Sequence, residues 1–572
     1  MNFKFYTIIV MLLVAMQGML ANSRAQEKDA ADVDISATKE AEENAANQEA
    51  GAYERKSVSY IDALWLMDPT LKGLKSEHVA YVLEEIKKKI HMSRFDFNPL
   101  PEALISDFVA KANALKQITP DTLAMLMDET IVPKILSVVD MQKEARAANL
   151  LTEQQKNSFF SDKVKELGIT AVELEKVMNS AFIYIPFAGK YAKITNKKTK
   201  RITTSLQTGI LWYRISTKGE KPKAKLVVKK ASMSLGFAKE GKSYIGKGGL
   251  LNADVFSFRS MVKNCARNLL VATQEMPEFR LSSQVTEVDG GKVGFPLGKT
   301  EGLWVDDKYK IVEFMEDDEG SVKQEENGWV IVKSVADSNS KEGYKSKAFK
   351  VAGDPMEGVI ISEFPRIPID ILLKFKRFPY SNATENFSGT YIDSLEVSGG
   401  YGLQIDAQYN IGRYIGINQL FFDFGFGLGW GGAKGKAIVL GSGTSELKSV
   451  SNTCFDFSLL KKFYIGRMAL MIQPVFGIQS VAVDAGEIPG LLTTYYYELR
   501  NSGAGIAINT GAEYALTPAM NLGLGLGYQL YGKSKEWDFY GKAGTTGDWA
   551  DLGYTLNNEV ELDHSGLSIQ LY

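Results

Sequence analysis

Residues 420–430 read "LFFDFGFGLGW", and from Phe422 onward apolar residues alternate with small or polar ones. Successive side chains of a β-strand point to opposite faces. One face of this strand therefore carries Leu420, Phe422, Phe424, Phe426, Leu428 and Trp430. The other carries Asp423 and three glycines. The stretches "YGLQIDAQYNI" (401–411) and "MNLGLGLGYQL" (520–530) repeat the pattern, which predicts a set of long, one-sided strands.

These strands are about ten residues long, the length of a tilted strand that crosses a bilayer. Their apolar faces are unbroken and end in aromatic residues, which is typical of lipid-facing strands. A soluble β-sandwich or a lipocalin-like barrel is the alternative, but such folds keep apolar residues inside and charged residues outside. The pattern therefore favours a membrane barrel.

Turn and loop lengths extend this prediction to eight antiparallel strands within residues 366–572. Short turns are expected at 412–413, 466–467 and 517–518, and long polar connections at 379–394, 431–450, 485–501 and 532–562. Bacterial barrels have short periplasmic turns and long external loops. The predicted strands are 366–378, 395–411, 414–430, 451–465, 467–484, 502–516, 519–532 and 563–572.

Several charged residues fall on the face that would point into this transmembrane barrel. An eight-stranded barrel is filled by its own side chains, and buried charges need partners. We therefore expect a charge network that plugs the interior, with an ion path as the less favoured alternative. Its predicted members are Asp370, Lys374, Lys376, Asp406, Asp423 and Glu513.

The chain ends on "HSGLSIQLY" (564–572), again with alternating apolar residues. With the glycine–aromatic alternation and the turn asymmetry, this ending resembles the small outer-membrane barrel family typified by the OmpA transmembrane domain. The resemblance implies insertion among outer-membrane lipids by the barrel-assembly machinery, which would read Leu567, Ile569, Leu571 and Tyr572. Tyr572 is one residue out of phase, which requires either a bulge or a ring that faces inward.

The first residues have the pattern of a secretory signal peptide. Lys4 precedes an apolar run, and small residues stand before a cleavage point after Ala25. Residues 1–25 are therefore a predicted signal peptide. Residues 26–56 are rich in Ala and Glu, and we expect a disordered acidic tether, with a solvated helix as the alternative.

Residues 57–282 mix helical and strand patterns and predict a periplasmic α/β or α+β domain with a helical insertion near 119–180. Apolar spacing predicts a helix over 76–90, and a late long helix is expected to bury Cys265. The order of elements loosely resembles the periplasmic domain of CsgG-like curli-secretion and TolB-like proteins, which implies a scaffold or assembly role.

Residues 283–365 form a second predicted unit. The Asp-Gly-Gly sequence at 289–291 is a hairpin signal. The stretches "VDGGKV", "LGKTEGLWVDDKY" and "VAGDPMEGV" resemble the small SH3-like β-barrel at the C-terminus of the flagellar-assembly protein FlgT. That resemblance implies protein–protein contact.

Composition and motifs argue against nucleic-acid binding, a metal site and enzymatic catalysis. A net charge of −2 disfavours a nucleic-acid partner, and two distant cysteines with three histidines suit neither a zinc site nor a triad. His564 and Ser565 are adjacent, so a strand would point them to opposite faces, and we expect a solvated rim histidine. We therefore expect no enzyme activity, catalytic residue, cofactor or metal.

The sequence thus predicts an outer-membrane scaffold or assembly protein, anchored by its barrel, whose periplasmic domains bind envelope, secretion or surface-appendage proteins. One alternative is a ligand or adhesion receptor that acts through the external loops. A lipid-modifying barrel enzyme is the other.

Overall fold

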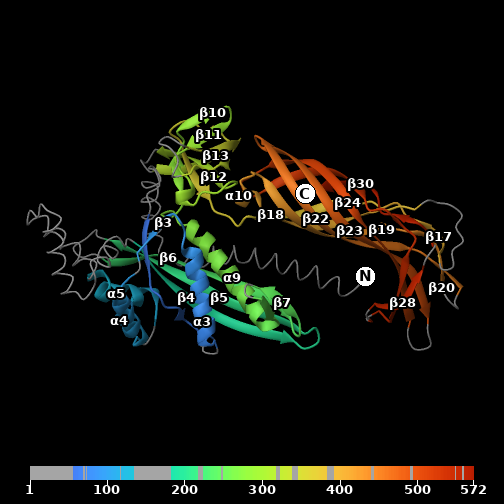
Figure 1. The fold of residues 1–572 in the computed structure, drawn as a ribbon, viewed down its shortest axis with the longest axis horizontal. Coiled ribbons are helices and arrows are strands. Elements are labelled where there is room, and N and C mark those ends of the chain that lie inside the picture. The colour runs from blue at the N-terminus through green and yellow to red at the C-terminus, as the bar shows by residue number, and fades with distance from the viewer. Residues whose placement is uncertain are drawn as a thin grey trace, which may run out of the picture.

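The computed structural model describes residues 56–68, 71, 74–98, 100–115, 118–133, 182–216, 223–246, 249–316, 322–337, 345–382, 392–439, 443–489, 494–545, 547, 549–556 and 559–572. The predicted signal peptide lies outside these residues, as do the tether up to residue 55 and most of the helical insertion. Figure 1 shows a mixed helix–strand domain, a small β-rich module and a barrel that continues into a further lobe.

The N-terminal domain, residues 56 to about 280, is built on a mixed sheet in the order β3-β1-β4-β5-β6, with β2 beside β4. Strand β1 pairs in parallel with β3 and β4, and β4, β5 and β6 pair antiparallel. The elements are β1 (Lys56–Tyr60), β2 (Trp65–Leu66), α3 (Ser76–Ile90), β3 (Phe95–Phe97), α4 (Glu102–Asn113), α5 (Pro120–Thr130), β4 (Phe182–Asn196), β5 (Arg201–Ser216), β6 (Lys223–Lys239), β7 (Ser243–Gly246), β8 (Gly249–Asn252) and α9 (Ala253–Gln274).

Helices cover both faces of this sheet. Val82 and Ile86 of α3 pack with Cys265 of α9 in the core on one face, so the predicted burial of Cys265 is confirmed. Leu123 of α5 and Phe108 of α4 pack in the core on the other face. Apolar residues at helical spacing place these side chains along single stripes.

The module, residues 281–364, is a sheet in the order β10-β11-β14-β13-β12-β15-β9. Gly290 and Gly291 both have positive φ in the turn that joins β10 to β11, which confirms the predicted hairpin. The elements are β9 (Ser282–Gln284), β10 (Glu287–Asp289), β11 (Lys292–Phe295), η2 (Lys299–Glu301), β12 (Lys308–Glu316), β13 (Val322–Ser334), β14 (Ser346–Ala352) and β15 (Ile360–Phe364).

Among the described residues, one antiparallel sheet of ten strands closes on itself, and β27 (Trp537–Ala543) and β28 (Ala550–Leu556) continue it from β24 outside the ring. In the ring, which forms the barrel, the pairing order is β23-β22-β19-β18-β16-β30-β25-β24, and β24 pairs with β23 to complete it. The strands of the ring are β16 (Ile369–Phe378), β18 (Gly400–Asn410), β19 (Leu420–Gly432), β22 (Ser449–Ile465), β23 (Met468–Pro489), β24 (Thr494–Ala515), β25 (Asn521–Leu530) and β30 (Gly566–Leu571).

Several predicted strand limits are wrong. The largest error is at β24, which begins at Thr494 rather than at residue 502. The strand predicted at 414–430 begins at Leu420, because α10 (Gly412–Ile415) precedes it and ends at Gly416 in the left-handed conformation that glycine tolerates. The strand predicted at 395–411 begins at Gly400, and β17 (Ile392–Glu396) belongs to a separate sheet, where it pairs with β20.

The segments predicted as long polar connections are also not simple loops, since they contain further strands. These segments contain β20 (Lys434–Val439), β21 (Gly443–Glu446), β26 (Lys533–Ser534), β27 (Trp537–Ala543), β28 (Ala550–Leu556) and β29 (Leu562–Asp563). With β17 and the far ends of β22, β23 and β24 they form a lobe, here called the distal lobe, at the end of the barrel away from the module (Figure 1). Trp537, Leu395 and Val483 lie in its apolar core, so burial of apolar surface folds segments that look polar in the sequence.

Candidate membrane surface and barrel interior

The outer face of the barrel is apolar all the way round. Cross-strand partners share a face of the sheet, and one such row crosses seven strands, from Ile371 through Ala407, Phe424, Phe457, Phe476 and Ile506 to Leu530. Ala407 is half-buried, and the other six side chains are exposed. Soluble monomers rarely expose contiguous apolar patches beyond a few hundred Å². This exposed apolar surface around the barrel, here called the belt, therefore needs an apolar environment.

The ends of the belt are aromatic. Phe375 and Tyr401 stack with ring centroids 6.1 Å apart, and Tyr409 stacks on Tyr414 at 6.1 Å. Tyr409 and Tyr401 stand at opposite ends of β18. Aromatic rings at both edges of an apolar band are typical of the two interfaces of a bilayer.

The interior is polar, and six of its charged side chains form three ion pairs. Lys374 Nζ lies 2.5 Å from Asp406 Oδ2 on the neighbouring strand. Lys376 Nζ lies 3.1 Å from Asp456 Oδ2, and Lys462 Nζ lies 2.8 Å from Glu513 Oε2. All six side chains are nearly inaccessible to solvent. Burial of a charge is tolerated only with such a partner.

The structure places five of the six predicted network residues in this interior, and two of them pair with residues that the prediction missed. Asp456 and Lys462 lie on β22 and complete those two pairs. Asp423 accepts a hydrogen bond of 2.9 Å from Gln408 Nε2. Asp370 stands apart, since it pairs with Arg366 at 2.7 Å and its side chain is one-third exposed.

Glycines on the inner face make room for this filling. An added Cβ at Gly429 would stand 2.0 Å from Asn452 Oδ1 and 2.7 Å from the Phe378 ring, and one at Gly477 would meet the hydroxyl of Tyr531. The alternation of glycine with aromatic residues therefore has two causes. The aromatic residues cover the outside, and the glycines let large inner side chains cross a narrow lumen.

The C-terminal residues divide between the two faces. Leu567, Ile569 and Leu571 are exposed on the apolar belt. The Tyr572 ring turns inward, where its hydroxyl lies 2.9 Å from Met471 Sδ. A Cβ at Gly523 would stand 2.2 Å from this ring, so the glycine provides its space. Of the two alternatives left open by the sequence, the inward-facing ring is correct, because β30 pairs with β25 in unbroken register.

His564 differs from the prediction of a solvated rim residue. It is fully buried in the distal lobe, and its Nε2 lies 2.7 Å from Asn501 Oδ1. Its ring packs where a Cβ at Gly503 would stand, at 2.7 Å. The neighbouring Ser565 Oγ accepts a hydrogen bond from the Gly532 amide instead. The two side chains therefore form no nucleophile–base pair in this arrangement.

The module contacts each short turn of the barrel. Asp306 accepts hydrogen bonds from Asn410 Nδ2 at 2.8 Å, from the Gln419 amide at 2.7 Å and from Gln419 Nε2 at 2.8 Å. At the second turn the Arg467 guanidinium lies 4.7 Å from the centre of the Trp329 ring. At the third, Lys308 Nζ donates to the Pro518 carbonyl.

Apolar packing and charge reinforce this contact. Trp329, Ile331 and Val351 of the module share a core cluster with Ala515 of the barrel. Burial raises the pKa of Asp306 above its usual value, and the hydrogen bonds from Asn410 and Gln419 oppose that rise. Burial lowers the pKa of Lys308 to about 7. The module is therefore held by a desolvated polar interface rather than by its linker alone.

The N-terminal domain is fixed to the module in the same way. The Arg94 guanidinium forms two hydrogen bonds with the Glu363 carboxylate, at 2.5 and 2.9 Å, and also donates to the Phe279 carbonyl. Both charged side chains are buried. A bidentate Arg–carboxylate pair fixes orientation as well as distance.

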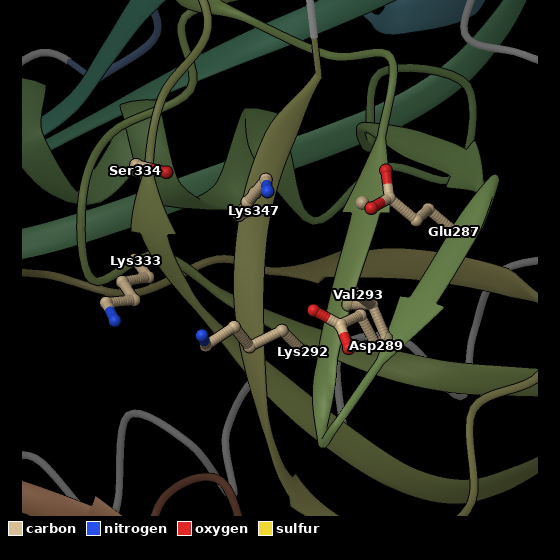
Figure 2. Close-up of a pocket in the computed structure, with 8 residues that line it drawn as sticks. Glu287, Asp289, Lys292, Val293, Lys333, Ser334 and Lys347 are labelled. Carbon is tan, nitrogen blue, oxygen red and sulfur yellow. The ribbon is translucent and has the colours of Figure 1, made fainter.

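A shallow pocket of about 260 Å³ lies on the module and is lined by acidic and basic side chains. In Figure 2, Lys292 extends across the strand that carries Lys347 toward the side on which Lys333 lies, and Glu287 and Asp289 lie on the opposite side. Because charges of both signs line it, the pocket favours neither an anion nor a cation.

Comparisons with known proteins find no matching family model and no matching curated protein. Several solved structures are similar to part of the chain. Neisserial surface protein A is 16% identical, with 36% of this chain and 95% of that chain covered and a TM-score of 0.21. A major outer membrane protein from Thermus thermophilus is 14% identical, with 36% and 99% covered and a TM-score of 0.22. The outer membrane protease OmpT from Escherichia coli is 8% identical, with 47% and 91% covered and a TM-score of 0.20.

At these TM-scores the similarities assign no function to this chain. Within the described ranges, no helix has the length and apolar character needed to cross a membrane. Across the same ranges, no group of three or more His, Cys, Asp or Glu side chains is arranged to hold a metal ion.

Proposed function

We propose that this protein is an outer-membrane-anchored scaffold or assembly protein. The eight-stranded barrel spans the outer membrane, and the N-terminal domain and the module stand in the periplasm, where they bind envelope, secretion or surface-appendage proteins. The apolar belt with aromatic edges supports the membrane span, because lipid is the environment in which such a surface is stable.

The lengths of the turns support this orientation of the barrel. The short turns meet the module, and the long connections build the distal lobe. Barrels of the bacterial outer membrane keep their short turns in the periplasm, so the module and the N-terminal domain belong to the periplasmic side.

The observation that carries the scaffold role is the rigid connection between barrel and domains. A simple tether needs only a flexible linker. This chain instead holds the module by contacts to three turns and holds the N-terminal domain by the buried Arg94–Glu363 pair. A fixed orientation relative to the membrane is useful when partners must be arranged around it.

Site-specific photo-crosslinking in living cells tests this role on the full chain. Exposed positions on the N-terminal domain (Met125, Leu66) and on the module (Met356) are each replaced by a photoreactive residue, with Leu552 in the distal lobe as the matched control. The scaffold role predicts adducts with envelope proteins from the first set and none from Leu552.

The second candidate is a surface receptor, and the folded distal lobe favours it over a set of loose loops. Adducts with external ligands from Leu552, with none from the N-terminal domain or module, would establish the receptor and reject the scaffold.

A further inference from the structure

Strands β4, β5 and β6 extend beyond the helices that cover their sheet on one side. On one face of this extension Ser257 of α9 packs against the sheet, with its hydroxyl 2.8 Å from that of Thr204. No element within the described ranges covers the opposite face there. It exposes four apolar side chains from two strands: Ile194, which is 67% exposed, with Met233, Leu235 and Phe237.

The hairpin β7–β8 adds two more apolar side chains to the same end. Ile245 and Leu250 are cross-strand partners and are 88% and 76% exposed. Their hairpin is anchored from its other side, where Tyr244 stacks on Phe256 of α9 at 4.3 Å. Ile245 follows Tyr244 in the strand and therefore lies on the other face of the hairpin, together with its partner Leu250, so core packing among the described residues does not explain the exposure of either.

Basic residues surround these apolar side chains. Residues 190–201 and 239–246 carry eight basic side chains and one acidic side chain, Glu240. The exposed lysines include Lys197, Lys198, Lys200 and Lys242. The Arg201 guanidinium lies 4.7 Å from the centre of the exposed Phe237 ring. Apolar side chains surrounded by Lys and Arg suit the interface of an anionic membrane. The apolar side chains contact the acyl boundary, and the basic side chains attract the anionic headgroups.

The direction of this extension agrees with such a surface. In Figure 1 the strands that end beside β7 extend from the N-terminal domain toward the same side as the barrel extends from the module. If the barrel spans a membrane, its periplasmic leaflet therefore lies on the side to which the tip points.

We propose that this tip, made of Ile194, Phe237, Ile245 and Leu250 with the surrounding lysines, docks on the anionic phospholipid surface of the membrane that the barrel spans. The inference rests on the proposed membrane span. It gives the N-terminal domain a second membrane contact, at a distance from the barrel wall.

Spin labels on the full chain, reconstituted in phosphatidylcholine–phosphatidylglycerol vesicles, test this docking. Leu250→Cys, Ile508→Cys and Met356→Cys are labelled in separate proteins. Both native cysteines are buried. Collision with oxygen, which concentrates in lipid, is compared with collision with a water-soluble nickel complex. Ile508 lies on the barrel belt, and Met356 is an exposed module residue.

Docking predicts that the label at 250 is accessible to the nickel complex in detergent and protected in vesicles, while the label at 508 is protected in both and the label at 356 is accessible in both. Pure phosphatidylcholine vesicles, or the triple change Lys197→Gln, Lys198→Gln and Lys200→Gln, should restore accessibility at 250 and leave 508 unchanged.

A label at 250 that stays in water while the label at 508 is in lipid overturns the docking and leaves the barrel anchor intact. Water accessibility at 508 rejects the membrane span, and the docking with it. Protection at 250 accompanied by dipolar broadening between labels identifies a second copy of this chain as the occupant, which also overturns the proposal.

Discussion

Asp306 and Gln419 are both in the left-handed conformation, with φ of 70° and 53°, and they bond to each other across the contact between module and barrel. Non-glycine residues rarely adopt this conformation and persist in it where surrounding contacts fix them. The Asp306 carboxylate supplies those contacts, since it also accepts from Asn410.

Asp306→Ala should loosen the module from the barrel. It leaves three donors without their acceptor, and we expect a loss of about 2–4 kcal/mol in the free energy of docking, based on typical costs of unsatisfied buried groups. Hydrogen exchange of the Gln419 amide measures the effect, which should be a large increase in exchange rate. Asp306→Asn keeps one acceptor oxygen and should show a smaller increase. Equal rates in the wild type and Asp306→Ala would show that the contact does not depend on this carboxylate.

The Lys376–Asp456 pair should stabilise the barrel through its interior. The two residues lie on β16 and β22, which are separated by β18 and β19 in the barrel wall. Lys376→Met leaves Asp456 buried without its cation, and removal of one partner of a buried pair costs about 3–5 kcal/mol. Urea unfolding in phospholipid vesicles measures the loss. The double variant Lys376→Met with Asp456→Asn should recover much of it; a double variant as unstable as the two losses added together would argue against direct coupling.

Stability of the module–barrel contact should depend on pH through Lys308. Burial, reinforced by nearby Arg366, lowers its pKa to about 7, and Asp370 opposes the shift. The unfolded chain therefore binds the proton more readily than the folded chain between pH 7 and about 10.4, the usual lysine value. Over that range the folded state gains up to about 1.4 kcal/mol per pH unit as pH rises, and below pH 7 the cost of the buried charge is fully present.

Lys308→Met removes this dependence. Its stability relative to the wild type should be more favourable at pH 6.5 than at pH 9, as measured from urea unfolding midpoints followed by fluorescence. Parallel pH profiles for the two proteins would exclude Lys308 as the titrating group.

A charge on the belt should be costly only if lipid surrounds the barrel. Leu526 lies in the middle of β25 and is half exposed. Leu526→Arg should destabilise the vesicle-folded barrel by about 2–4 kcal/mol, the cost of Arg at the bilayer midplane. Met125→Arg, on an exposed helix position of the N-terminal domain, should change stability by less than about 0.5 kcal/mol. Similar small effects at both positions would indicate that Leu526 faces water.

The sequence predicts the barrel strands well because their outer faces obey a local rule. Phe424 and Phe426 must both face outward, and period-two alternation records this directly. The inner pairs follow no local rule. Asp456 pairs with Lys376 across the lumen. The residues around Asp456 in the sequence do not indicate this pairing, because the two strands are not adjacent. Gly523 leaves space for an aromatic ring on the inner face of the barrel, but the sequence does not indicate that the Tyr572 ring fills this space.

The distal lobe and the module contact were also beyond sequence reasoning. Trp537 and Leu395 lie in one core, although Trp537 comes from a predicted polar connection and Leu395 from the start of a predicted barrel strand. Asp306 lies in "LWVDDKY", which the sequence indicates only as part of the predicted module, and its bonds to Asn410 and Gln419 depend on how two folded units meet. Burial between segments that are far apart in the sequence produces no periodic pattern of apolar residues within either segment.

Cysteine labelling on intact cells tests the anchoring and orientation most directly. Lys448→Cys, exposed in the distal lobe, and Met356→Cys, exposed on the module, are treated separately with a membrane-impermeant maleimide. The account predicts that Lys448→Cys is labelled on intact cells and that Met356→Cys is labelled only after the outer membrane is permeabilised. Labelling of Met356→Cys but not Lys448→Cys on intact cells would contradict the orientation, and equal labelling of both would contradict the membrane anchor.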